Sequence, residues 1–406
     1  MRKRRPSAYP ASAEPRNDGT RRARILEDLR MAYVFTSESI TEGHPDKVCD
    51  LISDSILDAY LEQDRQSRVA CETMAKGNAV VLGGEITSRG KIDLDRVVRD
   101  AIRSVGYVCP DEPFCADSVE IHRFLSKQSP EISRKVDQES GEQGAGDQGL
   151  MFGFAARETE TLMPLPIHLA HRLSEGLAED RKSGRAPFLR PDGKTQVSVL
   201  YDGNTPMRLS TVVVSTQHEA AATPAKIEEY VMDGLLPRVL GDWHRDDMTV
   251  HVNPGGSFVE GGPSADCGLT GRKIIADTYG GMGRHGGGAF SGKDPSKVDR
   301  SAAYFCRYVA RRVVEEGLAD RAEIQVAYAI GGNRPVSVKV DTFGTGDEKR
   351  AEDFVCGFDF SPRAIVDQLG LLQPIFKSTV NYGHFGRPGF TWEGAPVPSS
   401  AGAEKR

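Results

Sequence analysis

The spacing of apolar residues predicts a long helix that begins near residue 45. Apolar side chains recur every three or four positions from Val48 to Leu61, as one face of a helix requires. Capping residues precede this run, and Pro45 suits the first helical position, where no backbone N–H is needed. The predicted helix ends near Gln63.

Four aspartates lie along this predicted helix at strict four-residue intervals: Asp46, Asp50, Asp54 and Asp58. A ladder of this kind usually marks a solvated face, and we expect this of Asp54 and Asp58. Asp46 differs because it lies in the first turn, directly after His44. Free backbone N–H groups at a helix start favour a ligand site there.

The rest of the pattern mixes short strands with helices. Strands are predicted at 33–35, 68–73, 79–87, 150–155, 196–201, 211–216, 324–329 and 336–341, and helices at 94–105, 167–178, 224–239, 296–316 and 362–369. Mixing of this kind, three times over, predicts an α+β fold of three modules. We place the modules at 31–131, 132–260 and 261–406. Residues 127–149 lack periodicity and predict a functional loop.

Length and composition narrow the class of protein. A chain of 406 residues with 38% hydrophobic and 27% charged residues is typical of two or three globular domains. No stretch reaches the roughly 18 apolar residues of a membrane-spanning helix, and we expect a cytoplasmic protein without membrane partners. The 7 cysteines are scattered and form no C-x-x-C pair, which argues against a disulfide framework or a zinc ribbon.

Charge is distributed unevenly along the chain. Residues 1–30 carry nine Lys or Arg and four acids, although the whole chain has a formal net charge of −6. The acidic remainder is a poor surface for nucleic acid, because such binding depends on neutralising phosphates. We expect residues 1–30 to be a disordered basic extension, since they hold too little apolar area to order themselves. A nucleic-acid or targeting arm, and translation that begins at Met31, are the alternatives.

Several strings approach known motifs without the required context. Residues 144–149 fit G-x-G-x-x-G, but a strand is predicted after them rather than before, unlike a dinucleotide-binding turn. Residues 287–293 fit most of a P-loop, yet Asp294 replaces the Ser or Thr that would hold magnesium. Residues 285–288 resemble an oxyanion loop, but the chain has no G-x-S-x-G elbow. His168 and His171 lack an H-E-x-x-H pattern and are predicted to lie on a helix surface.

A local basic region nevertheless indicates phosphate chemistry. Residues 271–300 hold six Lys or Arg and three acids within an otherwise acidic chain. Flexible glycines let backbone N–H groups approach an anion, Lys and Arg neutralise it, and isolated aspartates hold magnesium. Residues 43–47 and 261–273 carry the same kinds of residue. Together these patches predict polyphosphate binding rather than a solvated basic loop.

Strings within and around these patches resemble the S-adenosylmethionine synthetase family, also called methionine adenosyltransferases, over about residues 33–392. They are FTSESITEGHPDK (35–47), GGEIT (83–87), KQSPEI (127–132), GAGDQGLMFG (144–153), LRPDGK (189–194), residues 261–300 and YGHFGR (382–387). GHPDK and GGGAFSGKDPSKVDRSA are highly specific in combination. The resemblance implies transfer of the adenosyl group of ATP to the sulfur of L-methionine, followed by cleavage of the triphosphate to pyrophosphate and phosphate.

The residues fit this reaction. A thioether is a neutral nucleophile with no proton to remove, so the lack of a catalytic triad is no obstacle. Catalysis then depends on in-line positioning and on stabilising the departing triphosphate. As cofactors the resemblance implies two Mg²⁺ ions per site and K⁺.

The resemblance also implies roles for individual positions. The residues expected in catalysis are His44, Lys194, Arg272 and Lys293. The residues expected to bind ATP are His44, Asp192, Lys194, Phe258, Asp266, Arg272, Lys273, Lys293 and Ile330. The residues expected to bind methionine are Glu85, Gln128, Asp266 and Lys297. Asp46 and Asp299 match the magnesium ligands, and Glu72 matches the potassium ligand.

At the level of architecture, the resemblance implies three similar modules related by a pseudo-threefold axis, each a mixed sheet with helices on one face. It implies a homo-oligomer, a dimer of dimers with the active site at the dimer interface, and a mobile gate at about 128–137. Ala265, Gly283 and the turn at 331–334 depart from the family pattern. Ala265 would be strained if its position required a positive φ.

Two functions from other classes stay open on the sequence alone. A kinase would also use ATP but would transfer only the γ-phosphoryl group. A catalytically silent, regulatory subunit would bind without turnover. The silent subunit has no need of every charged contact, so the presence of the following residues argues against it: His44, Asp46, Lys194, Lys293 and Asp299.

Overall fold

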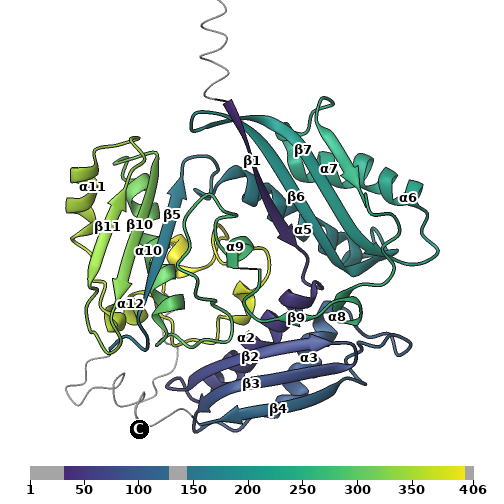
Figure 1. The fold of residues 1–406 in the computed structure, drawn as a ribbon, viewed down its shortest axis with the longest axis horizontal. Coiled ribbons are helices and arrows are strands. Elements are labelled where there is room, and N and C mark those ends of the chain that lie inside the picture. The colour runs from purple at the N-terminus through teal and green to yellow at the C-terminus, as the bar shows by residue number, and fades with distance from the viewer. Residues whose placement is uncertain (1–31, 128–143, 398–406) are drawn as a thin grey trace, which may run out of the picture.

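The computed structural model describes residues 32–127 and 144–397, which form three sheets around a central region of loops (Figure 1). Mixed sheets and helices alternate along the chain, so the predicted α+β class is confirmed. The basic extension, Gln128 and the gate at 128–137 lie outside the described residues. The pseudo-threefold axis and the module boundaries stay predictions.

Each sheet collects strands from distant parts of the chain. The first has the order β4-β3-β2-β9, with β2 (Arg68–Lys76), β3 (Ala79–Thr87), β4 (Glu120–Ser126) and β9 (Gly268–Leu269). The second has the order β1-β6-β7-β8, with β1 (Ala32–Ile40), β6 (Leu189–Asp202), β7 (Thr205–His218) and β8 (Thr249–Val252). The third has the order β11-β10-β5, with β5 (Gly149–Ala156), β10 (Arg321–Tyr328) and β11 (Ser337–Asp341).

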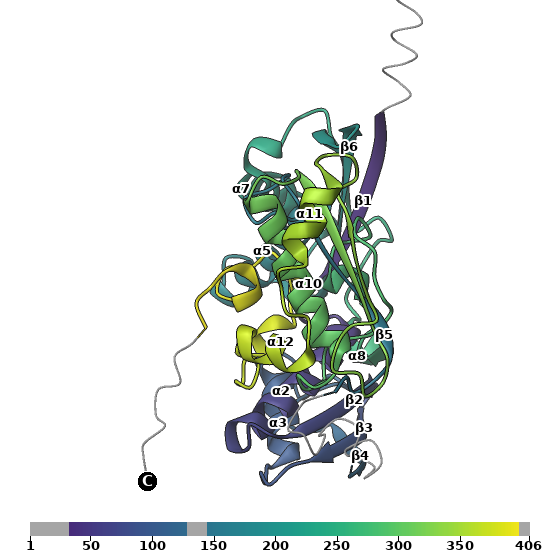
Figure 2. The same ribbon diagram turned by 90° about the vertical axis from the view of Figure 1, so that its left-hand side faces the viewer.

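The long helices gather on one side of the sheets and leave the other side to the strands (Figure 2). They are α2 (Pro45–Gln63), α3 (Leu94–Val105), α5 (Leu165–Ser183), α10 (Val298–Glu315), α11 (Glu348–Val355) and α12 (Pro362–Leu369). Shorter segments are α6 (Pro224–Glu229), a π-helical turn (Tyr230–Leu235), α7 (Leu236–Leu240), α8 (Gly262–Ala265) and α9 (Ile274–Asp277), with 3₁₀ turns at Gly241–Trp243, Lys377–Thr379 and Thr391–Glu393. The apolar core lies between helices and sheets.

Strand pairing between distant segments brings the predicted site strings together. β1 precedes α2 in sequence, yet it pairs with β6 over its whole length, from Ala32 opposite Asp202 to Ile40 opposite Lys194. The chain then leaves β1 directly into the loop that starts α2. Lys194 and the start of α2 are therefore neighbours, although about 150 residues separate them.

The aspartates of α2 are buried, which corrects the expectation that Asp54 and Asp58 are solvated. The exposed fraction is 1% for Asp46, 0% for Asp50 and Asp54, and 7% for Asp58. Each carboxylate accepts backbone N–H groups from a distant loop, as follows in chain order: Leu269 (3.0 Å), Gly271 (2.8 Å), Gly292 (2.8 Å), and Phe376 with Lys377 (3.0 and 2.8 Å). We call these four carboxylates the aspartate ladder.

Buried cations balance the middle of the aspartate ladder. Lys47 Nζ lies 3.0 Å from Asp50 Oδ2 and 2.6 Å from Asp277 Oδ1. Both terminal nitrogens of Arg300 lie 2.7 Å from the oxygens of Asp54. A buried carboxylate is stable only when it is paired and hydrogen-bonded, and these contacts meet that requirement.

Three smaller expectations can be compared with the structure. His171 is buried rather than on a helix surface: its Nδ1 lies 2.7 Å from Ser39 Oγ, and burial lowers its pKa to about 3. His168 is half-buried. Ala265 ends α8 without a positive φ, so this departure causes no strain. At Gly283, an added Cβ would lie 2.8 Å from Phe154 Cβ, so glycine fits the space.

The aspartate ladder predicts a large stability effect at its last position. Burial raises the pKa of Asp58 to about 7, so the fold disfavours the ionised form, and the comparison is made near pH 4, where the carboxyl is neutral in the folded protein and this penalty is small. Asp58→Asn leaves an amide donor facing one of two buried N–H groups, and we expect the free energy of unfolding to fall by about 1–3 kcal/mol. Urea denaturation followed by circular dichroism measures this.

The matched control is Asp353→Asn. Asp353 is exposed and contacts Lys349 at 2.5 Å, so its loss should change stability by less than ~1 kcal/mol. Equal losses in the two variants would contradict the structural role of Asp58.

Candidate active site

The first predicted cluster lies at the N-terminus of α2. Asp46 accepts the Leu269 N–H at Oδ1, and Lys273 Nζ lies 2.6 Å from its Oδ2. Arg272 Nε lies 3.5 Å from Oδ1. Burial favours the neutral carboxyl, but the hydrogen bonds from Lys273 and Leu269 outweigh it and hold the pKa of Asp46 below its usual value. Asp46 is therefore an ionised carboxylate in the first turn of α2, and the partly exposed side chains of Arg272 and Lys273 reach it.

His44 caps the same helix and is a neutral imidazole. Burial and the Lys273 ammonium lower its pKa to about 3, and Lys194 adds to this effect. Its Nδ1 accepts the Asp46 backbone N–H at 3.2 Å. In a neutral imidazole whose Nδ1 accepts, Nε2 carries the proton. His44 therefore offers one N–H donor at Nε2.

The second cluster lies on one face of β2 and β3. Ala70 is paired with Glu85 on one side and forms an isolated bridge with Lys293 on the other. Directly paired residues share a face, and Glu72 is two positions from Ala70, so Glu72, Glu85 and Lys293 lie on the same face. Desolvation raises the pKa of Glu72, Lys293 opposes the rise and Glu85 adds to it.

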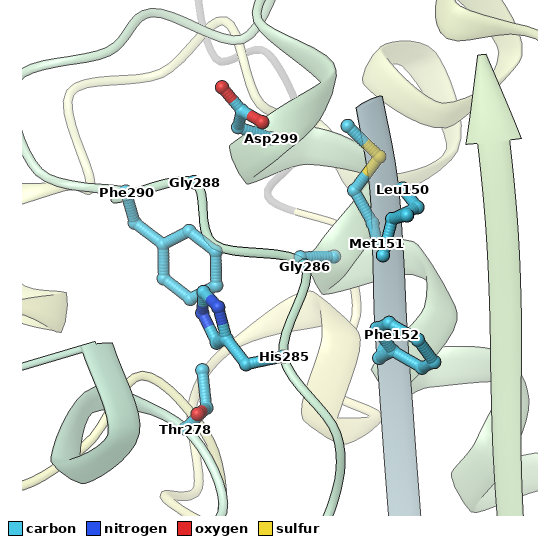
Figure 3. Close-up of a pocket in the computed structure, with 10 residues that line it drawn as sticks. Leu150, Met151, Phe152, Thr278, His285, Gly286, Gly288, Phe290 and Asp299 are labelled. Carbon is cyan, nitrogen blue, oxygen red and sulfur yellow. The ribbon is translucent and has the colours of Figure 1, made fainter. Parts of the chain in front are cut away.

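The glycine-rich loop, residues 286–293, lies beside β5 and reaches the first turn of α10, as Figure 3 shows for Gly286, Gly288 and Asp299. An added Cβ at Gly286 would lie 1.7 Å from the Leu150 carbonyl oxygen, and one at Gly288 would lie 2.3 Å from Asp299 Oδ1. Lys293 Nζ lies 2.7 Å from Asp299 Oδ2. Only glycine allows this approach, and the loop thereby carries Lys293 to Asp299.

Asp294 holds the end of this loop, where a P-loop would have Ser or Thr. Its Oδ2 accepts the Val69 N–H at 2.7 Å, and its Oδ1 accepts the Ser296 N–H at 2.9 Å. Lys297 forms an ion pair with the same carboxylate. Asp294 is therefore committed to protein contacts, which agrees with the rejection of a P-loop.

The third cluster joins the start of β6 to α8. Asp192 Oδ2 accepts the Gly262 N–H at 2.8 Å, and the Asp192 N–H is donated to Gln217 Oε1 at 3.2 Å. Burial raises the pKa of Asp192 to about 6, against the opposing effect of the Gly262 hydrogen bond. Phe258 is half-buried, and its N–H is donated to His218 Nε2 at 3.0 Å. Asp266 is exposed at the end of α8.

The structure joins the first and third clusters through Lys194, and it groups Lys293 and Lys297 with Glu72 in the second. The positive charge of Lys194 acts to lower the pKa of both His44 and Asp192. The charges of Lys293 and Lys297 both oppose the rise in the pKa of Glu72. Ile330 is 46% exposed on the turn after β10 and has no contact with the other predicted residues that the structure records. The sequence pattern did not reveal Asp54 and Arg300, which hold Gly292 beside Lys293. The four-residue spacing with Asp46 was the available signal.

Two properties of the described residues bear on other kinds of site. No helix there is long and apolar enough to cross a membrane. No group of three or more His, Cys, Asp or Glu residues is arranged there to hold a metal ion by itself. A metal at these aspartates would therefore need further ligands from outside the described protein groups.

Comparison with known proteins now decides the family. Residues 32–130, 142–258 and 260–394 match the N-terminal, central and C-terminal domain models of S-adenosylmethionine synthetase. The chain belongs to the S-adenosylmethionine synthetase family. It is an adenosyltransferase that forms S-adenosylmethionine from methionine and ATP. This assignment replaces the two alternative functions, a kinase and a silent regulatory subunit.

Curated relatives agree over most of their length. The S-adenosylmethionine synthase of Sorangium cellulosum is 55% identical over 368 residues, which is 89% of this chain and 87% of the relative. That of Salinibacter ruber is 55% identical over 370 residues, or 89% and 96% of the two chains. That of Wolinella succinogenes is 51% identical over 371 residues, or 90% and 96%.

The contact between Gly288 and Asp299 predicts a loss of activity without a loss of fold. Gly288→Ala places a methyl group 2.3 Å from Asp299 Oδ1 and 2.9 Å from Asp299 Cβ, so the carboxylate must rotate away and the loop, which is exposed at Gly287, must shift slightly. We expect Asp299 to be displaced and S-adenosylmethionine formation to fall by about 10- to 100-fold, with little change in melting temperature. Gly255→Ala is the control, since its added Cβ meets nothing within 4 Å. Equal activity of the two variants would show that the position of Asp299 does not matter.

Proposed function

We propose that the three clusters form one site, in which the methionine sulfur attacks the ribose C5′ of ATP and the whole triphosphate leaves. The observation that supports this most is a pair of lysine–aspartate contacts on separate elements, Lys273 with Asp46 and Lys293 with Asp299, at 2.6 and 2.7 Å. They offer both charges that a metal-bound triphosphate needs, because lysine neutralises phosphate and aspartate binds a hard cation.

Two magnesium ions are part of this proposal, and the residues present fit them. Asp46 and Asp299 each form an ion pair with a lysine at one carboxylate oxygen, and a carboxylate in an ion pair can exchange that partner for a metal cation. Mg²⁺ in proteins commonly takes one or two carboxylates and completes its octahedron with water and substrate phosphates. That habit agrees with the absence of a three-ligand cluster among the described residues. Bound magnesium would stabilise charge on the triphosphate.

A potassium ion is proposed at Glu72. The neighbouring Glu85 shares its strand face, and burial, with a smaller contribution from the like charge of Glu85, raises the pKa of Glu72 despite Lys293. A monovalent cation at this face would relieve that repulsion. The same face suits the ammonium group of methionine, which we assign to Glu85, with Gln128, Asp266 and Lys297 as the remaining proposed contacts.

The proposed chemistry needs no general base. The thioether sulfur attacks with its own lone pair, so the barrier falls through alignment and through stabilisation of the leaving oxygen. His44 Nε2–H is the proposed donor to that oxygen, since Nδ1 is already occupied. Lys194, Arg272 and Lys293 would neutralise the phosphates, and Lys273 would assist them. Cleavage of the triphosphate to pyrophosphate and phosphate follows in the same pocket.

Adenine recognition is proposed for the third cluster. Phe258 supplies a half-buried ring and Asp192 a buried carboxyl that hydrogen-bonds the loop before Asp266. Ile330 lies away from these residues, so a role for it against adenine needs a second subunit or a change in the loops. ATP and L-methionine are therefore the proposed small-molecule partners, in a cytoplasmic setting and without nucleic acid.

We further propose a homo-oligomer, a dimer of dimers, in which the open strand face forms the dimer interface. Helices cover one side of the sheets (Figure 2), and several residues of the strands are exposed apolar ones. Phe124 is 71% exposed on β4 and lies in the same row as Gly83 and Glu72. An apolar patch beside the proposed potassium and methionine contacts suits an interface that contains the active site.

Loss of Lys293 tests the role of the basic loop. Lys293→Ala should fold normally, because the one ion pair of its side chain recorded among the described residues is the partly exposed contact with Asp299, yet lose at least about 100-fold in kcat for S-adenosylmethionine. Mass spectrometry of S-adenosylmethionine, with assays for pyrophosphate and phosphate, measures all three products. Lys349→Ala, an exposed lysine on α11, is the control and should keep its rate. A wild-type rate for Lys293→Ala would overturn the assignment of this loop.

Disruption of the open face tests the dimer. Phe124→Glu places a charge in the proposed interface and should shift the protein to a smaller assembly by light scattering, with a parallel loss of activity. Val108→Glu is the control, because Val108 is 50% exposed in the loop after α3 and not on the strand face. If Phe124→Glu keeps both its size and its activity, this face is not the interface.

A further inference from the structure

The YGHFGR string belongs to the family resemblance, but none of the proposed ligand contacts involves it. Its histidine, His384, is fully buried, and its Nδ1 lies 2.7 Å from the hydroxyl of Tyr304. The same hydroxyl accepts the Nε–H of Arg300 at 3.0 Å. A buried line of hydrogen bonds therefore runs from the C-terminal segment to Arg300 on α10.

Arg300 is held in one orientation by every part of its guanidinium. Its two terminal nitrogens bind Asp54 in a bidentate pair, both at 2.7 Å. The Nη2 group also donates a hydrogen bond to Thr379 Oγ1 at 3.1 Å. The guanidinium carbon lies 4.2 Å from the centre of the Phe376 ring. A planar guanidinium with this many fixed partners has a single position.

This pair contacts the chain on both sides of the Lys293 α-carbon. Asp54 Oδ1 accepts the Gly292 N–H at 2.8 Å, and Arg300 Nη1 is donated to the Lys293 carbonyl oxygen at 3.2 Å. Gly292 has a φ of +82°, and an added Cβ there would lie 2.1 Å from the Cys71 carbonyl oxygen. The backbone that carries Lys293 is thus clamped between α2, β2 and α10.

We propose that Asp54 and Arg300, supported by Tyr304 and His384, are positioning residues that set where the Lys293 ammonium meets the triphosphate. The proposal rests on the proposed role of Lys293. All four side chains are fully buried, and the contacts of Asp54 and Arg300 with this loop are to its backbone, so they act through the backbone of Lys293. They would also explain why the YGHFGR string accompanies the glycine-rich loop in this chain.

The chain contains a matched pair that separates positioning from general stability. Arg307 lies on the same helix, is also fully buried and binds Glu393 in a bidentate pair at 2.9 and 3.0 Å. Its Nη1 group also donates hydrogen bonds to the backbone carbonyls of Phe154 and Leu162, at 2.8 and 3.0 Å. Its recorded contacts do not include the loop that carries Lys293.

The experiment compares Arg300→Lys with Arg307→Lys. Lysine keeps the charge, but its single ammonium cannot serve a bidentate carboxylate and a carbonyl together. We expect both variants to lose melting temperature. Only Arg300→Lys should lose about 10- to 100-fold in kcat, both for S-adenosylmethionine formation and for hydrolysis of added tripolyphosphate, while its KM for methionine stays within about twofold. Equal kcat losses in the two variants would overturn the proposal.

A milder pair of variants covers the case in which Arg300→Lys fails to fold. Tyr304→Phe removes the hydroxyl between Arg300 and His384, and its control is Tyr328→Phe, whose buried hydroxyl is donated only to the Phe360 carbonyl at 2.7 Å. We expect tripolyphosphate hydrolysis to fall by about 3- to 10-fold in Tyr304→Phe alone. Indistinguishable rates of the two variants would count against the proposal.

Combination with Lys293→Ala separates the two possible failures. If Arg300 acts through Lys293, adding Arg300→Lys to Lys293→Ala should cost less than about twofold further in kcat. A full additional loss would contradict action through Lys293. A wild-type rate for Lys293→Ala alone would instead overturn the proposed role of Lys293 itself.

Discussion

The structure depends on a row of carboxylates on one helix that accept backbone N–H groups from loops far away in sequence. Leu269, Gly271, Gly292 and the segment at 376–377 each contact a different rung of the aspartate ladder. Loops rich in glycine lose much conformational entropy on ordering, and side-chain packing does little to hold them. Charge-assisted hydrogen bonds to a rigid helix supply that order, so α2 acts as the frame on which the site is assembled.

Asp54, inside the aspartate ladder, and Asp46, at its start, differ in how their charge is balanced. Asp54 is matched by a fully buried arginine, and breaking such a pair typically costs about 3–5 kcal/mol, so this rung is structural. Asp46 is matched by Lys273 and Arg272, whose side chains remain partly exposed. Asp54 is therefore a fixed anchor in the interior. Asp46, at the helix start, is a carboxylate that can exchange its cation partners. Access of solvent and ligand to the cation distinguishes the two roles.

Local signals in the sequence predicted the elements better than their surroundings. Pro45 and the apolar spacing located α2 correctly, and the residue types of GHPDK and of 286–300 were sufficient to indicate polyphosphate binding. The burial of Asp54 escaped prediction because periodicity identifies an apolar face, whereas α2 is enclosed on nearly all sides. Likewise, no local pattern reveals that β1 pairs with β6 or that Glu393 meets Arg307. Such long-range pairings depend on the whole chain.

The lysine–aspartate contacts also have a consequence for the order of events at the site. In the structure Lys273 and Lys293 pair with the aspartates that are proposed to bind metal. A metal-bound triphosphate brings both partners at once, since its phosphates attract the lysines and its cations attract the released carboxylates. The exchange conserves the number of ion pairs, so neither charge is left unpaired in a region where that would be costly. Rearrangement of these pairs therefore favours a ligand that carries both charges.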